Sequence, residues 1–161
     1  MRKIMIISVL LFLFCGVASV AAAQDFTIED DSLSALPQDV IKVVKRGDKD
    51  REIKACTFIG EPIDLDGDDN ATDFFVTTAD ACGWGAALGP IWIVRSSGRS
   101  YSLVLSGVGY GATLQEQKTK GLVNITIWAA TAGWESSTPW VFNGRKYTKG
   151  DRIFKDLNGR K

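Results

Sequence analysis

The sequence predicts a mainly β (α+β) fold: a single antiparallel β-meander domain of five to seven strands with a short N-terminal helix. Three observations support this. Short runs rich in β-branched and aromatic residues fill the chain after residue 72, glycine- and serine-rich breaks separate them, and one amphipathic segment precedes them. No repeat of fixed period is evident, which disfavours a propeller or a solenoid.

Residues 1–23 have the features of a secretory signal peptide. Arg2 and Lys3 precede an apolar run that ends in small residues, with Ala21 and Ala23 at the two small-residue positions of a cleavage site. We expect cleavage after Ala23. The run approaches the ~18 residues that a membrane span needs, so an uncleaved anchor is the alternative. Cleavage predicts a periplasmic or secreted protein without membrane insertion of the mature chain.

Two kinds of segment follow the predicted cleavage site. Residues 24–36 are polar and acidic without a clear period, and we expect a flexible N-terminal arm. Residues 37–161 are expected to form the single β-rich domain. This domain begins with a helix, since Pro37 suits a helix start and Val40 and Val44 fall on one face. The β-branched residues of the same segment also suit a strand, which is the alternative.

Four later segments have strand composition. The clearest alternates along its length, with Val123, Ile125 and Ile127 on one face. The predicted strands are residues 72–79, 90–97, 101–107 and 122–130. A glycine-rich stretch, "SGVGYGAT" at 106–113, lacks the lysine and the strand-turn-helix context of a phosphate-binding loop, so we interpret it as a strand bulge or hairpin.

The Asn-Gly pair at 143–144 predicts a hairpin near the C-terminus. This pair favours a two-residue type I′ turn, because both positions tolerate the positive φ that the turn requires. Such a turn places Phe142 opposite Arg145. It also places Trp140, Phe142 and Tyr147 on one face of the hairpin.

The cysteines indicate an oxidising compartment. Cys15 lies in the signal peptide, so the mature chain keeps Cys56 and Cys82, and an even pair in an exported protein predicts a disulfide. A catalytic thiol is the alternative. The chain contains no histidine, which removes the usual base for a cysteine or serine nucleophile, and we expect no enzymatic activity.

The net charge gives no reason to expect nucleic-acid binding. The chain carries 19 basic and 19 acidic residues, and loss of the signal peptide leaves it slightly acidic. The distribution is uneven, with six acids and no base in residues 61–73, and nine bases and three acids in residues 118–161. Solubility of sheet edges and tails explains such patches as well as an anionic ligand does.

The acidic stretch "DLDGDDNATDFFV", residues 64–76, is the candidate metal site. Asp64, Asp66 and Asp68 alternate, so their carboxylates can point at one centre. Asn70 offers an amide oxygen and Asp73 could close the shell. Hard cations such as calcium take six to eight such oxygen ligands.

This stretch resembles the calcium loops of FG-GAP and integrin α-subunit blades, and of VCBS-type secreted bacterial β-repeat proteins. Those loops read D-x-D-x-D-G-x-x-D before an apolar strand. The resemblance assigns Asp64, Asp66 and Asp68 to the first three acidic positions and Asp73 to the last. Asp69 stands where the family has glycine, and one additional residue precedes Asp73. The resemblance implies calcium as a cofactor; a solvated turn without an ion is the open alternative.

Tryptophans supply the candidate ligand-binding residues. Trp92 and Trp140 lie within apolar runs and are expected in the core. Trp84 and Trp134 lie among small residues in loops, where an exposed ring can anchor a protein or a glycan. Folding back to cover the core is the alternative for both.

Together these features predict an exported, non-catalytic binding module that acts on a protein or glycan partner in the cell envelope. Inhibitors and immunity-type proteins have this size and compartment. Two alternatives remain open. One is a cell-envelope glycan hydrolase that uses loop carboxylates with Glu61 or Glu116. The other is a purely structural envelope protein. The oligomeric state does not follow from the sequence.

Overall fold

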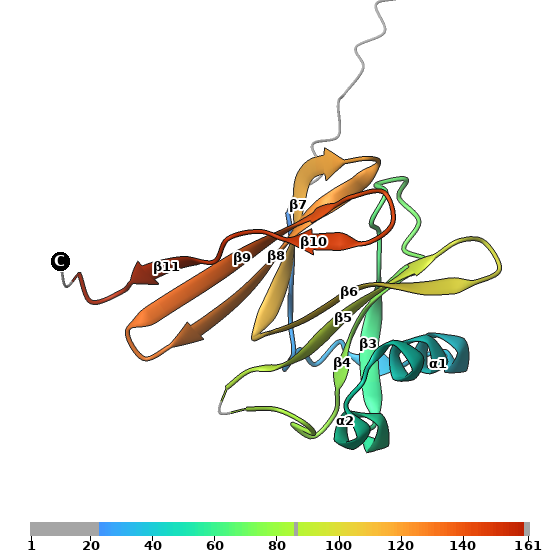
Figure 1. Cartoon of the computed structure of the whole chain (residues 1–161), viewed down its shortest axis with the longest axis horizontal. Helices are drawn as coiled ribbons and strands as arrows, with labels where there is room; N and C mark the ends of the chain where they lie inside the picture. The colour runs from blue at the N-terminus through green and yellow to red at the C-terminus, as the bar shows by residue number, and fades with distance from the viewer. Residues whose placement is uncertain (1–22, 86, 160–161) are drawn as a thin grey trace, which may run out of the picture.

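A computed structural model describes residues 23–85 and 87–159, so nearly all of the expected signal peptide lies outside the described residues. The described chain is mainly β, as predicted, with two antiparallel sheets and two short helices (Figure 1). Residues 23–85 and 87–159 form eleven strands instead of the expected five to seven. Four of these strands have four residues or fewer, so they are too short to show a recognisable alternation of apolar and polar residues in the sequence.

The first sheet has six strands, in the order β1-β7-β8-β9-β10 with β11 also paired to β9. Its strands are β1 (Gln24–Thr27), β7 (Gly111–Thr119), β8 (Leu122–Thr131), β9 (Trp134–Phe142), β10 (Tyr147–Lys149) and β11 (Ile153–Asp156). The second sheet has five strands in sequence order. They are β2 (Ser34–Ala35), β3 (Phe58–Ile63), β4 (Asp73–Thr78), β5 (Gly89–Ser96) and β6 (Tyr101–Gly109). The predicted meander is therefore correct for β2 to β6 and for β7 to β10, whereas β1 joins the six-stranded sheet beside β7 and β11 pairs with β9.

The five-stranded sheet is buried on both faces. Phe75 and Ile93 belong to the core between the two sheets, whereas Val76 and Trp92 belong to a second core beneath the helices. Successive residues of a strand point to opposite faces, so β4 and β5 are buried almost continuously. This explains why the β4 segment shows little alternation in sequence, while β8, which has one face in the core, alternates clearly.

The predicted helix is confirmed as α1 (Gln38–Gly47), preceded by Pro37. Val40 and Val44 are fully buried on one face, and basic residues in its last turn suit the helix dipole. A second helix, α2 (Arg51–Ala55), follows directly, and the Asp50 carboxylate caps its N-terminus by accepting a hydrogen bond from the Glu52 amide at 2.8 Å.

The expectation of a flexible N-terminal arm over residues 24–36 is wrong. β1 pairs with β7, and Phe26 and Ile28 are each only 2% exposed in the core between the sheets. β2 then pairs with β3, so two strands precede α1 and the helix does not stand at the N-terminus of the fold. Two buried apolar side chains hold this segment despite its acidic neighbours.

The glycine-rich stretch forms a passage from one sheet to the other. β6 ends at Gly109 and β7 begins at Gly111, so Tyr110 alone joins the two strands. The Tyr110 amide donates to the Trp128 carbonyl at 2.8 Å. A side chain at Gly109 would meet Ile127, so the close approach of β8 requires glycine there.

The Asn-Gly hairpin has a different register from the predicted one. Phe142 pairs with Tyr147, not with Arg145, so four residues form the turn. The Asn143 side-chain oxygen accepts hydrogen bonds from the Arg145 and Lys146 amides at 2.9 and 3.0 Å, which stabilises the longer loop. A register shift of two keeps every side chain on its face. The predicted aromatic face is therefore retained.

One part of the six-stranded sheet extends beyond the rest of the molecule. Figure 1 shows the ends of β8 and β9, with β11 beside them, extending away from the five-stranded sheet. β9 pairs with β10 through residues 140–142 and with β11 through residues 134–137. We call residues 129–137 together with 153–157 the projecting ribbon.

Candidate functional site

The acidic loop connects β3 to β4 and is organised by Asp64. Its Oδ1 accepts hydrogen bonds from the Gly67 and Asp68 amides at 2.7 and 3.4 Å, and its Oδ2 accepts one from the Asp69 amide at 2.9 Å. These bonds wrap the loop around one carboxylate, in the manner of an aspartate-initiated turn. Gly67 and Asp69 both have φ of +66°. Asp69 therefore has a left-handed backbone conformation, which aspartate tolerates better than most residues.

Three of the five predicted metal ligands lie together. One carboxylate oxygen from each of Asp64, Asp66 and Asp68 lies within 4.8 Å of the others. Partial burial, followed by the negative charges of Asp68 and Asp64, raises the pKa of the Asp66 carboxyl. Hydrogen bonds from Asn70 lower the pKa of Asp68. The cluster thus concentrates negative charge on one exposed turn, where a cation would relieve the repulsion.

Asp73 does not lie in this cluster. It is only 5% exposed, its Oδ1 accepts a hydrogen bond from the Ser96 amide at 2.7 Å, and its Oδ2 accepts one from the Leu65 amide at 3.2 Å. Burial raises the pKa of its carboxyl, although the two amides act in the opposite direction. Asp73 therefore joins the start of the acidic loop to the end of β5. The structure gives it a place in the interior and not among the clustered ligands.

A lysine that sequence reasoning missed contacts the loop. The Lys118 ammonium, from β7, donates a hydrogen bond to the Asp66 backbone carbonyl at 2.6 Å. The strand pairing of β7 with β8 is irregular between residues 114 and 118, and the adjacent loop approaches there. The excess of basic residues from residue 118 onward is the one feature of the sequence that points to such a contact. No spacing rule predicts that Lys118 in particular contacts Asp66.

The residues present fit a hard cation. The clustered donors are all carboxylate oxygens, which suit calcium or magnesium and not a softer metal. A carboxylate oxygen that accepts an amide hydrogen bond keeps a second lone pair, so Asp64 can shape the loop and still contribute to a cation. Lys118 contacts a backbone carbonyl and forms no ion pair with these carboxylates in the described residues.

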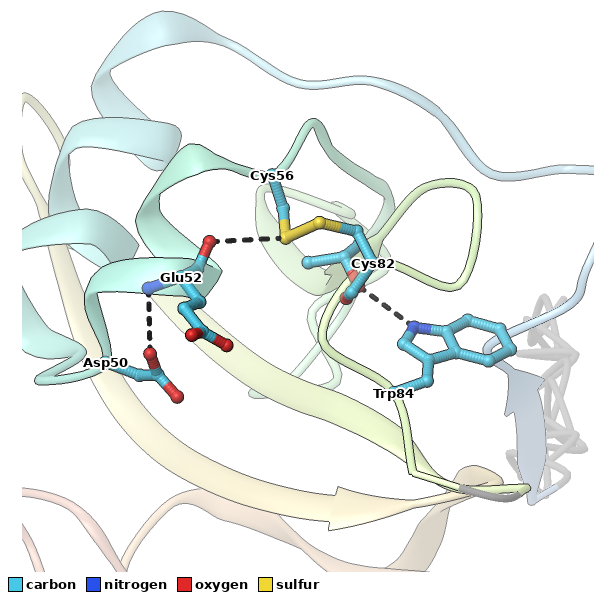
Figure 2. Close-up of a disulfide and its surroundings, with 6 residues drawn as sticks. Asp50, Glu52, Cys56, Cys82 and Trp84 are labelled. Carbon is cyan, nitrogen blue, oxygen red and sulfur yellow. Dashed lines mark hydrogen bonds between the residues drawn. A yellow bond between two sulfur atoms is a disulfide. The ribbon is translucent and has the colours of Figure 1, made fainter.

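The predicted disulfide is present. Cys56, directly after α2, is bonded to Cys82 in the loop after β4, with 5.8 Å between their Cα atoms (Figure 2). The Cys56 sulfur also lies 3.7 Å from the Glu52 carbonyl. A disulfide sulfur carries no hydrogen, so that approach is a contact only. The bond fastens the helical layer to the loop that leads into β5.

The Trp84 side chain packs over the core and is not an exposed ring available to a ligand. Its indole nitrogen donates to the Thr78 hydroxyl at 2.9 Å, and its ring packs against the core between the sheets. Figure 2 shows Trp84 beside the disulfide, with its indole nitrogen turned toward that hydrogen bond. Of the two tryptophans predicted to bind a ligand, Trp84 thus has a structural role.

Trp134 stands at the start of β9 on the projecting ribbon and is 52% exposed. Other exposed apolar side chains lie near it, on β11 and just after it. They are Ile153, Phe154 and Leu157, each more than half exposed. The Leu157 amide donates to the Gly133 carbonyl at 2.9 Å, which ties this segment to the turn before Trp134.

Neither helix of the described chain is long and apolar enough to span a membrane. Comparisons with protein-family models, with curated proteins and with solved structures find no match to this chain.

Proposed function

We propose that this chain is an exported, non-catalytic binding module that engages a protein partner in the cell envelope through the projecting ribbon. The observation that carries the proposal is the position of the exposed apolar side chains. In the described part of the chain six large apolar residues have exposed side chains, and four of them belong to the ribbon: Trp134, Ile153, Phe154 and Leu157. Exposed apolar side chains that gather in one place mark interaction surfaces on soluble proteins.

Strand register divides these side chains between the two faces of the ribbon. Trp134 lies opposite Asp156 and Phe154 lies opposite Ser136, so both rings share one face. Ile153, opposite Ser137, lies on the other face. Within the described residues β11 pairs only with β9, so its outer edge offers backbone hydrogen-bonding groups. An extended protein segment added to that edge would bury apolar side chains on both faces, which favours a protein over a glycan.

The export part of the proposal rests on the signal-like N-terminus and on the disulfide. Disulfides persist in oxidising compartments such as the periplasm and the extracellular space. Inhibitors and immunity-type proteins of the envelope remain the functional class that we favour, and a purely structural envelope protein is the alternative that needs no such surface.

The non-catalytic part rests on how the loop carboxylates are used. Asp64 and Asp73 accept five backbone amide hydrogen bonds between them, which gives both a role in shaping the fold. The hydrolase alternative depends on Glu116, which lines a hollow with Asp64 and Asp69, or on Glu61, whose pKa is raised by burial. Two carboxyl groups facing one another across a cleft would be required for that chemistry.

We also propose that the acidic loop binds calcium in a structural role. Asp66 and Asp68 would hold the ion together with Asp64, and the ion would offset the repulsion among the three carboxylates. A stiffened loop would then fix the connection between β3 and β4.

Capture from an envelope extract tests the ribbon. The wild-type chain and three variants are immobilised, and the recovered proteins are compared. Trp134→Ala and Phe154→Ala should each reduce recovery of the specific partner at least tenfold, as expected for central apolar anchors. Val141→Ala is the matched control, because Val141 is 39% exposed on β9 but lies outside the ribbon. Retention of the partner by both ribbon variants, or equal loss with Val141→Ala, refutes this surface.

A further inference from the structure

A cavity of about 450 Å³ lies beside the open edge of the five-stranded sheet, between β6 and strands β8 to β10. Its lining comes from segments far apart in sequence. Ser106 is on β6, Ile127 is on β8, Thr138 and Trp140 are on β9, and Lys149 and Arg152 are at and just after β10. The volume falls within the range of small-molecule sites.

The charged side chains that line the cavity are both basic. Lys149 and Arg152 both line it, and no acidic side chain does. In the part of the chain that the structure describes, neither of them forms an ion pair. The Arg152 guanidinium lies 5.9 Å from the centre of the Phe154 ring, which leaves its donors available to a ligand.

Trp140 contributes part of its side chain to the cavity wall, whereas its indole nitrogen is buried. Its Nε1 atom is buried and has no hydrogen-bond partner in the described residues. Buried polar groups in folded proteins almost always have a partner, and an orphaned one calls for an explanation. The other such atom, Asn124 Oδ1, belongs to the opposite face of β8, since Asn124 alternates with the core residues Val123 and Ile125. Because this nitrogen has almost no accessible surface, a ligand in the cavity contacts other atoms of the Trp140 side chain and not this donor.

The other residues that line the cavity indicate which kind of anion it would bind. Ser106 and Thr138 carry hydroxyl groups, whereas Ile127 and the Trp140 ring form an apolar wall. Inorganic phosphate would leave that wall in contact with water. An organic anion would place its charged group among the donors and its apolar body against the wall.

We propose that this cavity binds a small organic carboxylate. Arg152 and Lys149 pair with the carboxylate, and the apolar body packs on Ile127 and on the Trp140 side chain. A planar carboxylate matches the fork of guanidinium donors. This site is separate from the acidic loop and does not depend on the ribbon proposal.

Indole NMR signals provide a direct test. The chain has five tryptophans, so a ¹⁵N-tryptophan sample gives five indole N–H signals, and Trp140→Phe identifies one by its loss. Benzoate is titrated against its neutral analogue benzamide, against acetate and against inorganic phosphate. Benzoate should shift the Trp140 indole signal saturably, because its ring packs against that side chain, with Kd on the order of 1 mM. Acetate should bind more weakly because it lacks the apolar body, and benzamide should give no saturable shift.

Charge variants test the donors while leaving the fold intact, since both side chains are on exposed residues. Lys149→Gln and Arg152→Gln should each raise the Kd for benzoate about tenfold. Lys155→Gln is the matched control, because Lys155 is an exposed lysine of β11 that does not line the cavity. It should change the Kd less than twofold.

Several results would overturn the proposal. They are the absence of a saturable Trp140 shift with benzoate, an equal shift with benzamide, tighter binding of phosphate than of benzoate, and an unchanged Kd in both charge variants. The two proposals fail separately. Trp134→Ala should keep benzoate binding, whereas Trp140→Phe should keep partner capture by the ribbon.

Discussion

Removing the Cys56–Cys82 bond should destabilise the fold by about 3.5 kcal/mol. The two cysteines are 26 residues apart, and the chain-entropy model gives an entropy loss of about 12 cal/mol/K in the unfolded chain for a closed loop of that length. The closed loop contains β3, the acidic loop and β4, so the bond restricts the unfolded β3–β4 hairpin. For a chain of this size the loss corresponds to a fall in Tm of roughly 10 °C.

Urea unfolding of wild type and of the double variant Cys56→Ala/Cys82→Ala measures this loss. Because the restriction acts on the unfolded chain, the variant should also show a larger m-value, as its denatured state is more expanded. Wild type that is unfolded and refolded in reductant is the control and should resemble the variant. A loss below 1 kcal/mol, or a reduced wild type as stable as the oxidised one, would refute the entropic reasoning.

Two further predictions concern the acidic loop. Asp73→Asn should destabilise the fold by about 1–3 kcal/mol at pH 7, because an amide nitrogen would face one of the two backbone N–H groups that now donate to the carboxylate. Burial raises the Asp73 pKa, so the contribution of Asp73 to folding stability is greatest below the ordinary pKa of 3.8 and declines as pH rises through the folded-state pKa. The difference in unfolding free energy between wild type and variant should therefore shrink from pH 3 to neutrality. A difference that grows over this range would contradict the expected sign. Calcium should raise Tm by mass action and release heat in calorimetry, and Asp66→Asn or Asp68→Asn should weaken both effects. Wild type that gives neither heat nor a Tm shift at millimolar calcium would show that the loop is a solvated turn.

Much of the fold follows from local pattern, and the departures have physical causes. The helix and the alternating β8 strand are confirmed, because a period of 3.6 or of 2 is visible wherever one face meets a core. β1 is not evident from the sequence, because Phe26 is its only apolar residue and its partner β7 lies more than 80 residues away. The Asn-Gly pair predicts a two-residue turn, since the sequence does not reveal that the Asn143 side chain stabilises a longer loop.

The candidate sites show more clearly that local sequence patterns do not predict contacts between distant segments. Alternation is enough to bring Asp64, Asp66 and Asp68 together, because the three are neighbours on one tight turn. Whether a carboxylate faces a cation or backbone amides is set by tertiary packing, so the interior position of Asp73 was not visible. The cavity beside Trp140 combines β6, β8, β9 and β10, and no local pattern contains it.

The direct connection between the two sheets through Tyr110 affects how the protein unfolds. Because only one residue joins β6 to β7, no loop can extend when the sheets separate. Separation of β7 from its neighbours therefore pulls directly on β6. Mechanical strain in either sheet is thereby transmitted to the other along the backbone. The two sheets should consequently open as one cooperative unit, and amide protons on both sides of Tyr110 should exchange with solvent at matching rates.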